Sequence, residues 1–394
     1  MFEKVEDYPV DPIMIGADYF EQDPRKDKLN LTVGIYQDDA GQTPVLKAVK
    51  RAEQQLMATQ TSKSYLALTG DAIYCSVLGN TLMGDAFDDM WVSAQTAGGA
   101  VALRVMADLL AQMPQTPSVW LQTPTYGNYI PILTAAGARF AHVPYYDAIK
   151  REITFEQMLD GLKSGKQGDV FLMQGVCHNP TGADMTAAQF DAVLDLLEAR
   201  GIIPWIDLAY LGFAQSFDAD CAMARKIASR FPECIVCVTL SKSFGIYRDR
   251  AGALFVKTKT SDRERIQRAV TAIVRSGASH APDHGPSVVR TILRDSELRN
   301  LWLKELDQMR TRVTQLRQNI VATEYDTFGT DRLSYMTSQT GMFSLLPLST
   351  AQELALTRDH GIHVVKGGRM NVARLGPRDV NMLINAVRDV TVRT

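Results

Sequence analysis

The sequence contains no hydrophobic run of the roughly 18 residues that a membrane-spanning helix needs. Its first residues also lack the apolar core of a signal peptide. Neither sign of charge dominates, because 42 lysines and arginines face 44 aspartates and glutamates, which leaves a net charge of −2. This balance gives no electrostatic reason to bind nucleic acid or an anionic membrane surface. We therefore expect a cytoplasmic protein with neither nucleic acid nor membrane as a partner.

Cysteine is also scarce. The five cysteines are an odd number, which argues against a disulfide framework. Cys234 and Cys237 form a C-x-x-C pair, but the apolar residues around them predict a buried strand rather than the turn of a redox or zinc site. Cys177 and His178 are adjacent, yet no second cluster of ligands accompanies them. We predict no metal site.

Short apolar runs alternate with helical patterns along the chain. The predicted strands are Trp91 to Gln95, Ser118 to Gln122, Phe140 to Val143, Val170 to Gln174, Ile202 to Ile206, Ile235 to Leu240 and Leu254 to Val256. Residues 187–200 have apolar side chains at helical spacing after Thr186, a suitable N-cap, and residues 295–323 predict a long helix leading from one domain into another. The alternation is typical of a mainly parallel sheet covered by helices on both faces.

Polar residues follow three of these predicted strands. Asn179, Asp207 and Lys242 each come just after an apolar run, and Arg250 follows eight residues after Lys242. Ligands of open α/β sheets bind beyond the carboxyl ends of the strands, so these side chains could meet at one crevice. An amide for a phenolic oxygen, a carboxylate for a pyridinium nitrogen and an amine for an aldehyde together match pyridoxal phosphate. Hydroxyls and the guanidinium of Arg250 would suit its phosphate.

These motifs resemble those of fold-type I, pyridoxal phosphate-dependent aminotransferases of the aspartate and aromatic amino acid subgroup. The similarity extends from residues 29–36 to residues 368–373, nearly the whole chain. It implies an α/β fold whose large domain, residues 46–310, holds the cofactor on a mainly parallel seven-stranded sheet flanked by helices. Residues 1–45 and 311–394 would form a smaller α+β domain, made from both termini, that closes over the active site.

The resemblance also implies a role for each matching residue. Lys242 would form the Schiff base with pyridoxal 5′-phosphate, Asp207 would pair with its ring nitrogen, and Tyr65 would reach its phosphate from a partner subunit; these are the predicted catalytic residues. The other predicted cofactor contacts are Gly98, Gly99, Ala100, Tyr126, Asn179, Tyr210, Thr239, Ser241 and Arg250. The predicted substrate contacts are Gly34, Tyr126, Asn179, Arg275 and Arg369.

Four positions depart from the family pattern. Tyr126 replaces the tryptophan that commonly stacks on the cofactor, and Ala100 lacks the hydroxyl usual in the glycine-rich turn. Gln174 stands where histidine is frequent, and we expect Tyr126, Tyr129 and Gln174 to alter the walls around the cofactor ring and the side-chain pocket. Arg374 stands where glycine is usual, and we expect its side chain to be solvated; a side chain pointing inward would instead add positive charge near the substrate carboxylates.

Two arginines indicate the substrates by resemblance. Arg369 would bind the α-carboxylate, and Arg275, from the partner subunit, would bind the distal carboxylate of aspartate or glutamate. Aromatic members keep the second arginine as well, so its presence does not separate the two substrate groups. We expect a homodimer with shared active sites that transfers amino groups from aromatic amino acids and from aspartate or glutamate to 2-oxo acids by ping-pong chemistry. The alternatives are an aspartate aminotransferase with little aromatic activity and, less favoured, a lyase or decarboxylase on the same fold.

Overall fold

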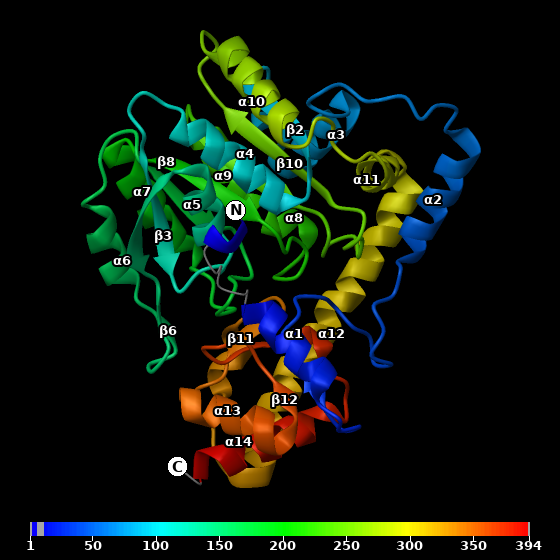
Figure 1. Cartoon of the computed structure of the whole chain (residues 1–394), viewed down its shortest axis with the longest axis vertical. Coiled ribbons are helices and arrows are strands. Elements are labelled where there is room, and N and C mark those ends of the chain that lie inside the picture. Colours follow the sequence, from blue (N-terminus) through cyan, green and yellow to red (C-terminus); the bar gives the residue numbers. More distant parts are fainter. Residues whose placement is uncertain (1, 6–11, 393–394) are drawn as a thin grey trace. The chain divides into compact units, whose positions relative to one another are not determined.

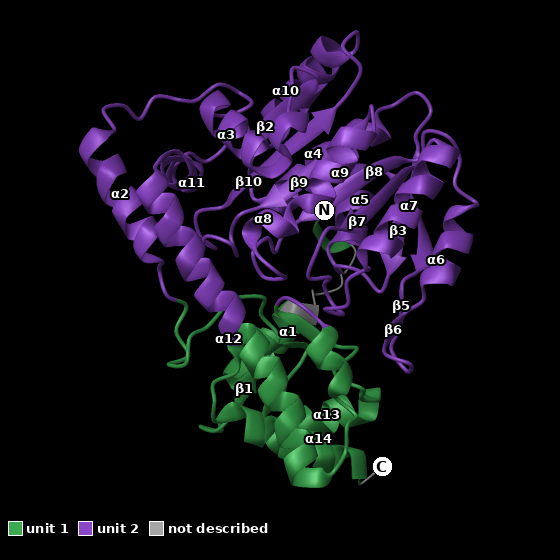
Figure 2. Cartoon of the chain, turned by 180° about the vertical axis from the view of Figure 1, so that it is seen from behind, with its two compact units in different colours: residues 1–43, 313–338, 342–394 green, residues 44–312, 339–341 purple. Residues whose placement is uncertain are grey.

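The computed structural model describes residues 2–5 and 12–392 (Figure 1). Contacts divide the chain into two compact units (Figure 2). Unit 1 contains residues 1–43, 313–338 and 342–394, and unit 2 contains residues 44–312 and 339–341. The long helix predicted at residues 295–323 is α12 (Ser296–Phe328), and it contributes residues to both units. Residues 339–341 join unit 2 although their neighbours on both sides belong to unit 1.

Unit 2 is built on a seven-stranded sheet with the order β2-β10-β9-β8-β7-β3-β4. Its strands are β2 (Trp91–Ala97), β3 (Ser118–Thr123), β4 (Arg139–Pro144), β7 (Val170–Gln174), β8 (Ile203–Leu208), β9 (Cys234–Thr239) and β10 (Ala251–Lys257). All seven predicted strands are confirmed. β10 runs antiparallel to β2 and β9, and the pairs from β9 through to β4 are parallel. The carboxyl ends of β7, β8 and β9 therefore meet at one edge.

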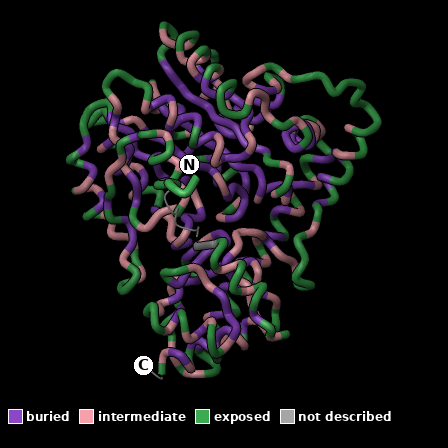
Figure 3. Tube along the Cα trace, in the orientation of Figure 1, coloured by how far each residue is buried: buried purple, intermediate pink, exposed green. Residues whose placement is uncertain are grey.

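Both faces of this sheet are buried. Figure 3 shows the tube along the central strands mostly in purple, the colour of buried residues. One face packs its alternate residues, among them Leu172 and Cys237, against apolar residues of α4, α5 and α10. Residues of the opposite parity, such as Phe171, Val236 and Phe255, are buried as well. Burial on both sides explains the nearly continuous apolar runs that predicted the strands.

Helices surround the sheet in unit 2. They are α2 (Lys47–Thr59), α3 (Ala72–Met83), α4 (Gly99–Ala111), α5 (Tyr129–Ala136), α6 (Phe155–Leu162), α7 (Ala187–Arg200), α8 (Phe217–Asp220), α9 (Ala222–Arg230), α10 (Arg263–Gly277) and α11 (His284–Arg294). α7 confirms the helix predicted at these residues, and Thr186 caps it in a capping box with Gln189. A small hairpin of β5 (Tyr146–Asp147) and β6 (Glu152–Ile153) completes unit 2.

Unit 1 combines helices with two short sheets. Its helices are α1 (Pro12–Gln22), α13 (Thr350–His360) and α14 (Asp379–Val392), with the second part of α12. β1 (Leu29–Asn30) pairs with β12 (Ile362–His363), and β11 (Phe343–Leu345) pairs with β13 (Arg369–Asn371). Strands from opposite ends of the sequence thus share one small α+β unit. Within the described ranges, no helix is long and apolar enough to cross a membrane.

Candidate active site

The three polar strand ends come together in unit 2, as the sequence predicts. Gln174, Asp207 and Cys237 occupy neighbouring register positions on β7, β8 and β9. The Lys242 ammonium lies 5.0 Å from the centroid of the Tyr210 ring. The Asn179 side-chain amide donates to the Tyr210 hydroxyl at 3.4 Å. An amine, a carboxylate, a phenol and an amide therefore share one edge of the sheet.

Lys242 is electrostatically unusual. Burial lowers the pKa of its ammonium from 10.5 to about 8, and the charge of Arg250 lowers it further, whereas the Asp207 carboxylate opposes the shift. At neutral pH this pKa leaves about a tenth of the Lys242 amine unprotonated, against well under a thousandth for an ordinary lysine. Because a neutral amine can act as a nucleophile and as a base, the lowered pKa makes Lys242 suitable for both reactions.

Asp207 is buried beside this lysine. Burial raises the pKa of its carboxyl to about 6, while a hydrogen bond from Tyr129 and the charge of Lys242 lower it. Its Oδ2 accepts the Tyr129 hydroxyl proton at 2.7 Å. Its Oδ1 is buried and has no hydrogen-bond partner within the described part of the chain. A buried carboxylate oxygen without a partner is costly unless a ligand supplies a proton donor.

The backbone at Asn179 is held from two directions. The Gln174 side chain accepts from the Asn179 backbone N at 2.8 Å and donates to its carbonyl at 2.9 Å. Asp184, which is half-buried, accepts from the backbone N of Cys177 at 2.8 Å and of His178 at 2.9 Å, and Cys177 has φ of +58°. The Gln174 side-chain amide therefore fixes the backbone of Asn179 through two hydrogen bonds. The sequence did not reveal this role.

A set of donors suited to an anion lies at the start of α4. Arg250 Nη1 donates to Ser241 at 3.2 Å, and its Nη2 donates to the carbonyl of Ala97 at 3.4 Å. A Cβ on Gly98 would overlap the Arg250 guanidinium, and one on Gly99 would overlap the hydroxyl of Thr239. The two glycines are thus required for close approach, and they leave the helix N-terminus beside a guanidinium and hydroxyls.

Two predicted residues lie on the surface of unit 2. Tyr65 is 86 % exposed, and its ring stacks on His280 with the ring centroids 4.6 Å apart. Arg275, near the end of α10, is also exposed and donates to the Ser279 hydroxyl. Both side chains therefore contact the same segment, residues 279–280, rather than the buried edge of the sheet. Tyr126 is half-buried and packs edge-on against Tyr129 at 5.3 Å between ring centroids.

The remaining predicted residues belong to unit 1. Arg369 on β13 is buried, donates to the carbonyl of Thr32 at 2.5 Å and lies 4.6 Å from the centroid of the Phe343 ring. A Cβ on Gly34 would come within 3.1 Å of the same ring. The guanidinium of Arg369 is thus supported by an aromatic face and a carbonyl within its own unit.

The expectation of a solvated Arg374 is wrong. Its side chain is half-buried, and its Nε donates to Gln37 at 3.1 Å. Burial lowers the pKa of this guanidinium from its ordinary value. Arg374 is the last residue of a short 3-10 turn directly after β13, and Gln37, its hydrogen-bond partner, belongs to the amino-terminal segment.

The cysteines and His178 have structural surroundings. The five cysteines are free and buried, and β9 is buried throughout, as predicted for Cys234 and Cys237. Burial lowers the pKa of His178 to about 3, so its ring is neutral, and Nδ1 pairs with the Thr181 hydroxyl at 2.9 Å. Neither feature contributes a reactive group to the site.

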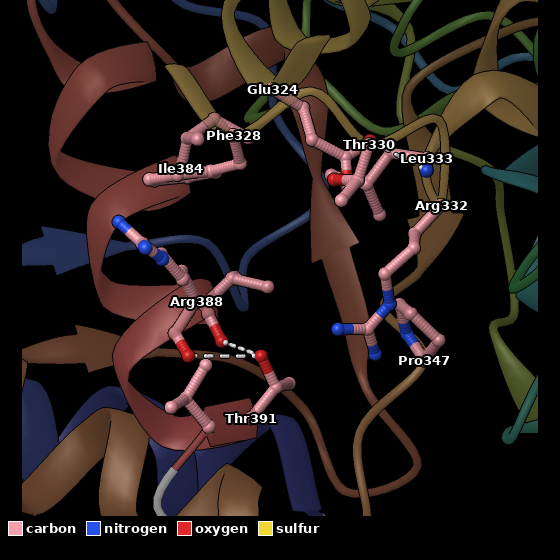
Figure 4. Close-up of a pocket in the computed structure, with 11 residues that line it drawn as sticks. Glu324, Phe328, Thr330, Arg332, Leu333, Pro347, Ile384, Arg388 and Thr391 are labelled. Atoms are coloured by element: carbon pink, nitrogen blue, oxygen red, sulfur yellow. Dashed lines mark hydrogen bonds between the residues drawn. The ribbon is translucent and has the colours of Figure 1, made fainter.

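A separate cavity of about 220 Å³ lies in unit 1 (Figure 4). The carboxylate of Glu324, which lines this cavity, is already hydrogen-bonded: it accepts from the Thr330 hydroxyl at 3.0 Å and from the Leu333 backbone N at 2.8 Å. The Arg388 guanidinium lies 4.2 Å from the centroid of the Phe328 ring. None of the predicted site residues lines this cavity.

Comparison with known proteins decides the family. A family model described as aminotransferase class I and II matches residues 26–387. The chain belongs to this aminotransferase family. The aminotransferase is 39 % identical to a tyrosine aminotransferase of Rhizobium meliloti (strain 1021), over 95 % of this chain and 96 % of the relative. It is 37 % identical to the aspartate aminotransferase of Escherichia coli (strain K12), over 98 % of this chain and 99 % of the relative.

Solved structures agree with this assignment. An aromatic-amino-acid aminotransferase from Burkholderia pseudomallei, described as covalently bound to pyridoxal phosphate, superimposes with a TM-score of 0.95 at 33 % identity. The match covers 99 % of each chain. The predicted fold-type I architecture of the aminotransferase is confirmed. The sequence placed Tyr129 among the walls of the ring site but did not show that its hydroxyl donates to Asp207, because a hydrogen bond between residues 78 positions apart leaves no local pattern.

Proposed function

We propose that this aminotransferase uses pyridoxal 5′-phosphate to transfer amino groups between 2-oxo acids and two groups of donors, the aromatic amino acids and aspartate or glutamate. The relatives described as tyrosine, aromatic-amino-acid and aspartate aminotransferases, each matching almost the full chain, support both groups of donors. The cytoplasm is the proposed location.

The residues of unit 2 fit this cofactor. The observation that carries the proposal is the unpartnered, buried Oδ1 of Asp207, beside a lysine whose pKa is lowered to about 8. Asp207 would pair with the ring nitrogen, Asn179 and Tyr210 with the ring oxygen, and Tyr126 with the ring face. The phosphate would be bound by the contacts at the start of α4 and by Thr239, Ser241 and Arg250. When bound, pyridoxal phosphate supplies an aldehyde and an electron-accepting ring.

The chain's own groups would then divide the work. Lys242 would hold the cofactor through its aldehyde, and the neutral amine that its lowered pKa makes accessible would act as the base for the substrate α-carbon proton. Asp207 stabilises positive charge on the ring nitrogen. Arg369 binds the substrate α-carboxylate through its planar guanidinium. The closure of unit 1 over the active site, expected from the family, stays a prediction.

We propose further that the enzyme is a homodimer with shared sites. Tyr65 and Arg275 support this, since both are exposed on unit 2 and contact neighbouring residues of one segment. An exposed tyrosine and an exposed arginine on one surface are suited to a partner subunit, where they would reach the phosphate and the distal substrate carboxylate. Gly34 would contribute backbone to the substrate site.

Single-turnover half-reactions test the proposal. The pyridoxal form of the enzyme is mixed with phenylalanine, tyrosine, tryptophan or aspartate, and the cofactor absorbance is followed. We expect specificity constants for phenylalanine and aspartate within about a hundredfold of each other. A preference for aspartate of more than about a thousandfold would favour the aspartate-specific alternative. No absorbance change with any of the four amino acids would overturn the proposal.

A further inference from the structure

Asp207 is fixed by a tyrosine of the protein core. Tyr129, the first residue of α5, is 1 % exposed and lies in the same apolar cluster as Trp205 and Cys237. Its hydroxyl donates to Asp207 Oδ2 at 2.7 Å, and both side chains are buried. Within the described part of the chain, no other side chain hydrogen-bonds to this carboxylate, and Oδ1 has no partner. The two carboxylate oxygens therefore differ: Oδ2 is used by a protein donor, and Oδ1 is left for a ligand.

The Tyr129 hydroxyl donates to a carboxylate rather than to a backbone carbonyl. A buried tyrosine hydroxyl needs a partner, and a backbone carbonyl is sufficient: Tyr145, also buried, donates to the carbonyl of Ala183 at 2.7 Å. Tyr129 instead donates to a carboxylate, and hydrogen bonds to ionised acceptors are roughly twice as strong as neutral ones. Tyr129 therefore stabilises the ionised form of the Asp207 carboxyl in addition to packing in the apolar core.

Three titratable groups lie beside Asp207, one from α5 and two from β9 and the segment that follows it. Tyr129 approaches from α5, Lys242 follows β9, and Cys237 lies beside it on β9. Burial keeps the pKa of the Cys237 thiol well above its usual value, so this neighbour is neutral. Lys242 and Tyr129 are thus the groups that favour the ionised carboxylate, and the cofactor engages Lys242 in the proposed function.

We propose, resting on the proposed function, that Tyr129 is a positioning residue for the cofactor: its hydroxyl occupies Oδ2, holds the Asp207 carboxylate in one orientation and leaves Oδ1 for the pyridine nitrogen. Once Lys242 is engaged with the cofactor aldehyde, Tyr129 is the protein side chain that still hydrogen-bonds to Asp207 and favours its ionised form. Tyr129 also packs edge-on against Tyr126, the residue proposed to lie on the face of the cofactor ring.

The test uses Tyr129→Phe, which removes the hydroxyl and keeps the ring. The apoprotein is titrated with pyridoxamine 5′-phosphate, which has no aldehyde to react with Lys242, and binding is measured by calorimetry between pH 6 and pH 8.5. We expect about tenfold weaker binding near pH 6.5, because loss of the donor raises the pKa of Asp207 and a protonated carboxyl pairs poorly with a pyridinium. The loss should shrink towards pH 8.5, where Asp207 is ionised in both proteins.

Three controls separate positioning from packing. Tyr145→Phe, which deletes a buried hydroxyl bonded to a carbonyl, should leave the affinity and its pH profile within about twofold of the wild type. In an Asp207→Ala background, Tyr129→Phe should have no further effect, since a residue that acts through Asp207 cannot act without it. Tyr129→His, whose ring N–H can donate to the carboxylate, should bind more tightly than Tyr129→Phe and serves as the second variant if the phenylalanine protein does not fold.

The outcomes are distinguishable. Binding within twofold of the wild type at every pH for Tyr129→Phe, or an equal loss in the Asp207→Ala background, would overturn the inference and leave the proposed function standing. A histidine variant that binds no better than a protein lacking Asp207 would also overturn it. Failure of the wild-type apoprotein to bind pyridoxamine phosphate would overturn the proposed function itself, and this inference with it.

Discussion

Replacing Lys242 by methionine should stabilise the cofactor-free enzyme near pH 7. Methionine has nearly the same length but no charge, so the variant removes the desolvation of the ammonium without opening a cavity. The lysine pKa falls from 10.5 to about 8 in the folded protein, and each unit of that difference corresponds to about 1.4 kcal/mol. The buried ammonium therefore destabilises the apoprotein by up to about 3 kcal/mol at neutral pH.

Asp207 already limits this penalty. Its carboxylate raises the pKa of Lys242, and that interaction is contained in the value of about 8. We therefore expect a net increase of about 1 to 3 kcal/mol in the free energy of unfolding. The effect has a defined pH dependence. A lysine with a lowered pKa destabilises the folded state fully below the folded pKa, near 8, and this penalty disappears as the pH rises to the unfolded value, 10.5.

Urea unfolding of the two apoproteins between pH 7 and pH 10 measures this difference. The advantage of Lys242→Met should be greatest at pH 7 to 8 and should decline at higher pH. Lys304→Met, at an exposed lysine of α12, is the matched control and should change stability by no more than about 0.5 kcal/mol at any pH. A Lys242→Met protein that is no more stable than the wild type, or whose advantage does not depend on pH, would refute the reasoning.

Three further predictions concern the substrate, the dimer and the cofactor. Arg275→Leu should lower the single-turnover specificity constant at least about a hundredfold for aspartate but about tenfold or less for phenylalanine, because only aspartate loses a charged partner. Equal losses for the two substrates would show that Arg275 supports the structure rather than binding the substrate side chain. Mixing Lys242→Ala subunits with subunits carrying Arg275→Ala and Tyr65→Phe should restore part of the transaminase activity, because one site of each heterodimer would be intact; no recovery after demonstrated subunit exchange would count against shared sites. Gly99→Ala should weaken pyridoxal phosphate binding about tenfold or more, as the added Cβ would overlap a neighbouring hydroxyl. Gly277→Ala, where a Cβ meets no atom within 4 Å, is its control, and unchanged affinity for Gly99→Ala would contradict the proposed phosphate site.

Local sequence patterns predicted the elements well. The seven strands of the large sheet were found because burial on both faces makes each one a short, nearly continuous apolar run. α7 was predicted at its observed limits because its capping residue and its apolar spacing lie within one short segment. α12 begins within one residue of its predicted start and continues to Phe328, five residues beyond the predicted end. Helix ends depend on tertiary contacts as well as on sequence, so such boundaries are less certain than the helix itself.

The sequence by itself determined which strand each of Asn179, Asp207 and Lys242 lies on or follows, since strand ends and polar residues are both local features. Only the tertiary structure decided that Tyr129, 78 residues from Asp207, donates to its carboxylate, and that Gly99 lies against Thr239. These contacts depend on how α4 and α5 pack onto the sheet. The surroundings that give Lys242 a pKa of about 8 are set in the same way, because burial and the charges of Asp207 and Arg250 act through space. A one-dimensional pattern records which residues are available, whereas the protonation state and orientation of each depend on distances that exist only after the chain has folded.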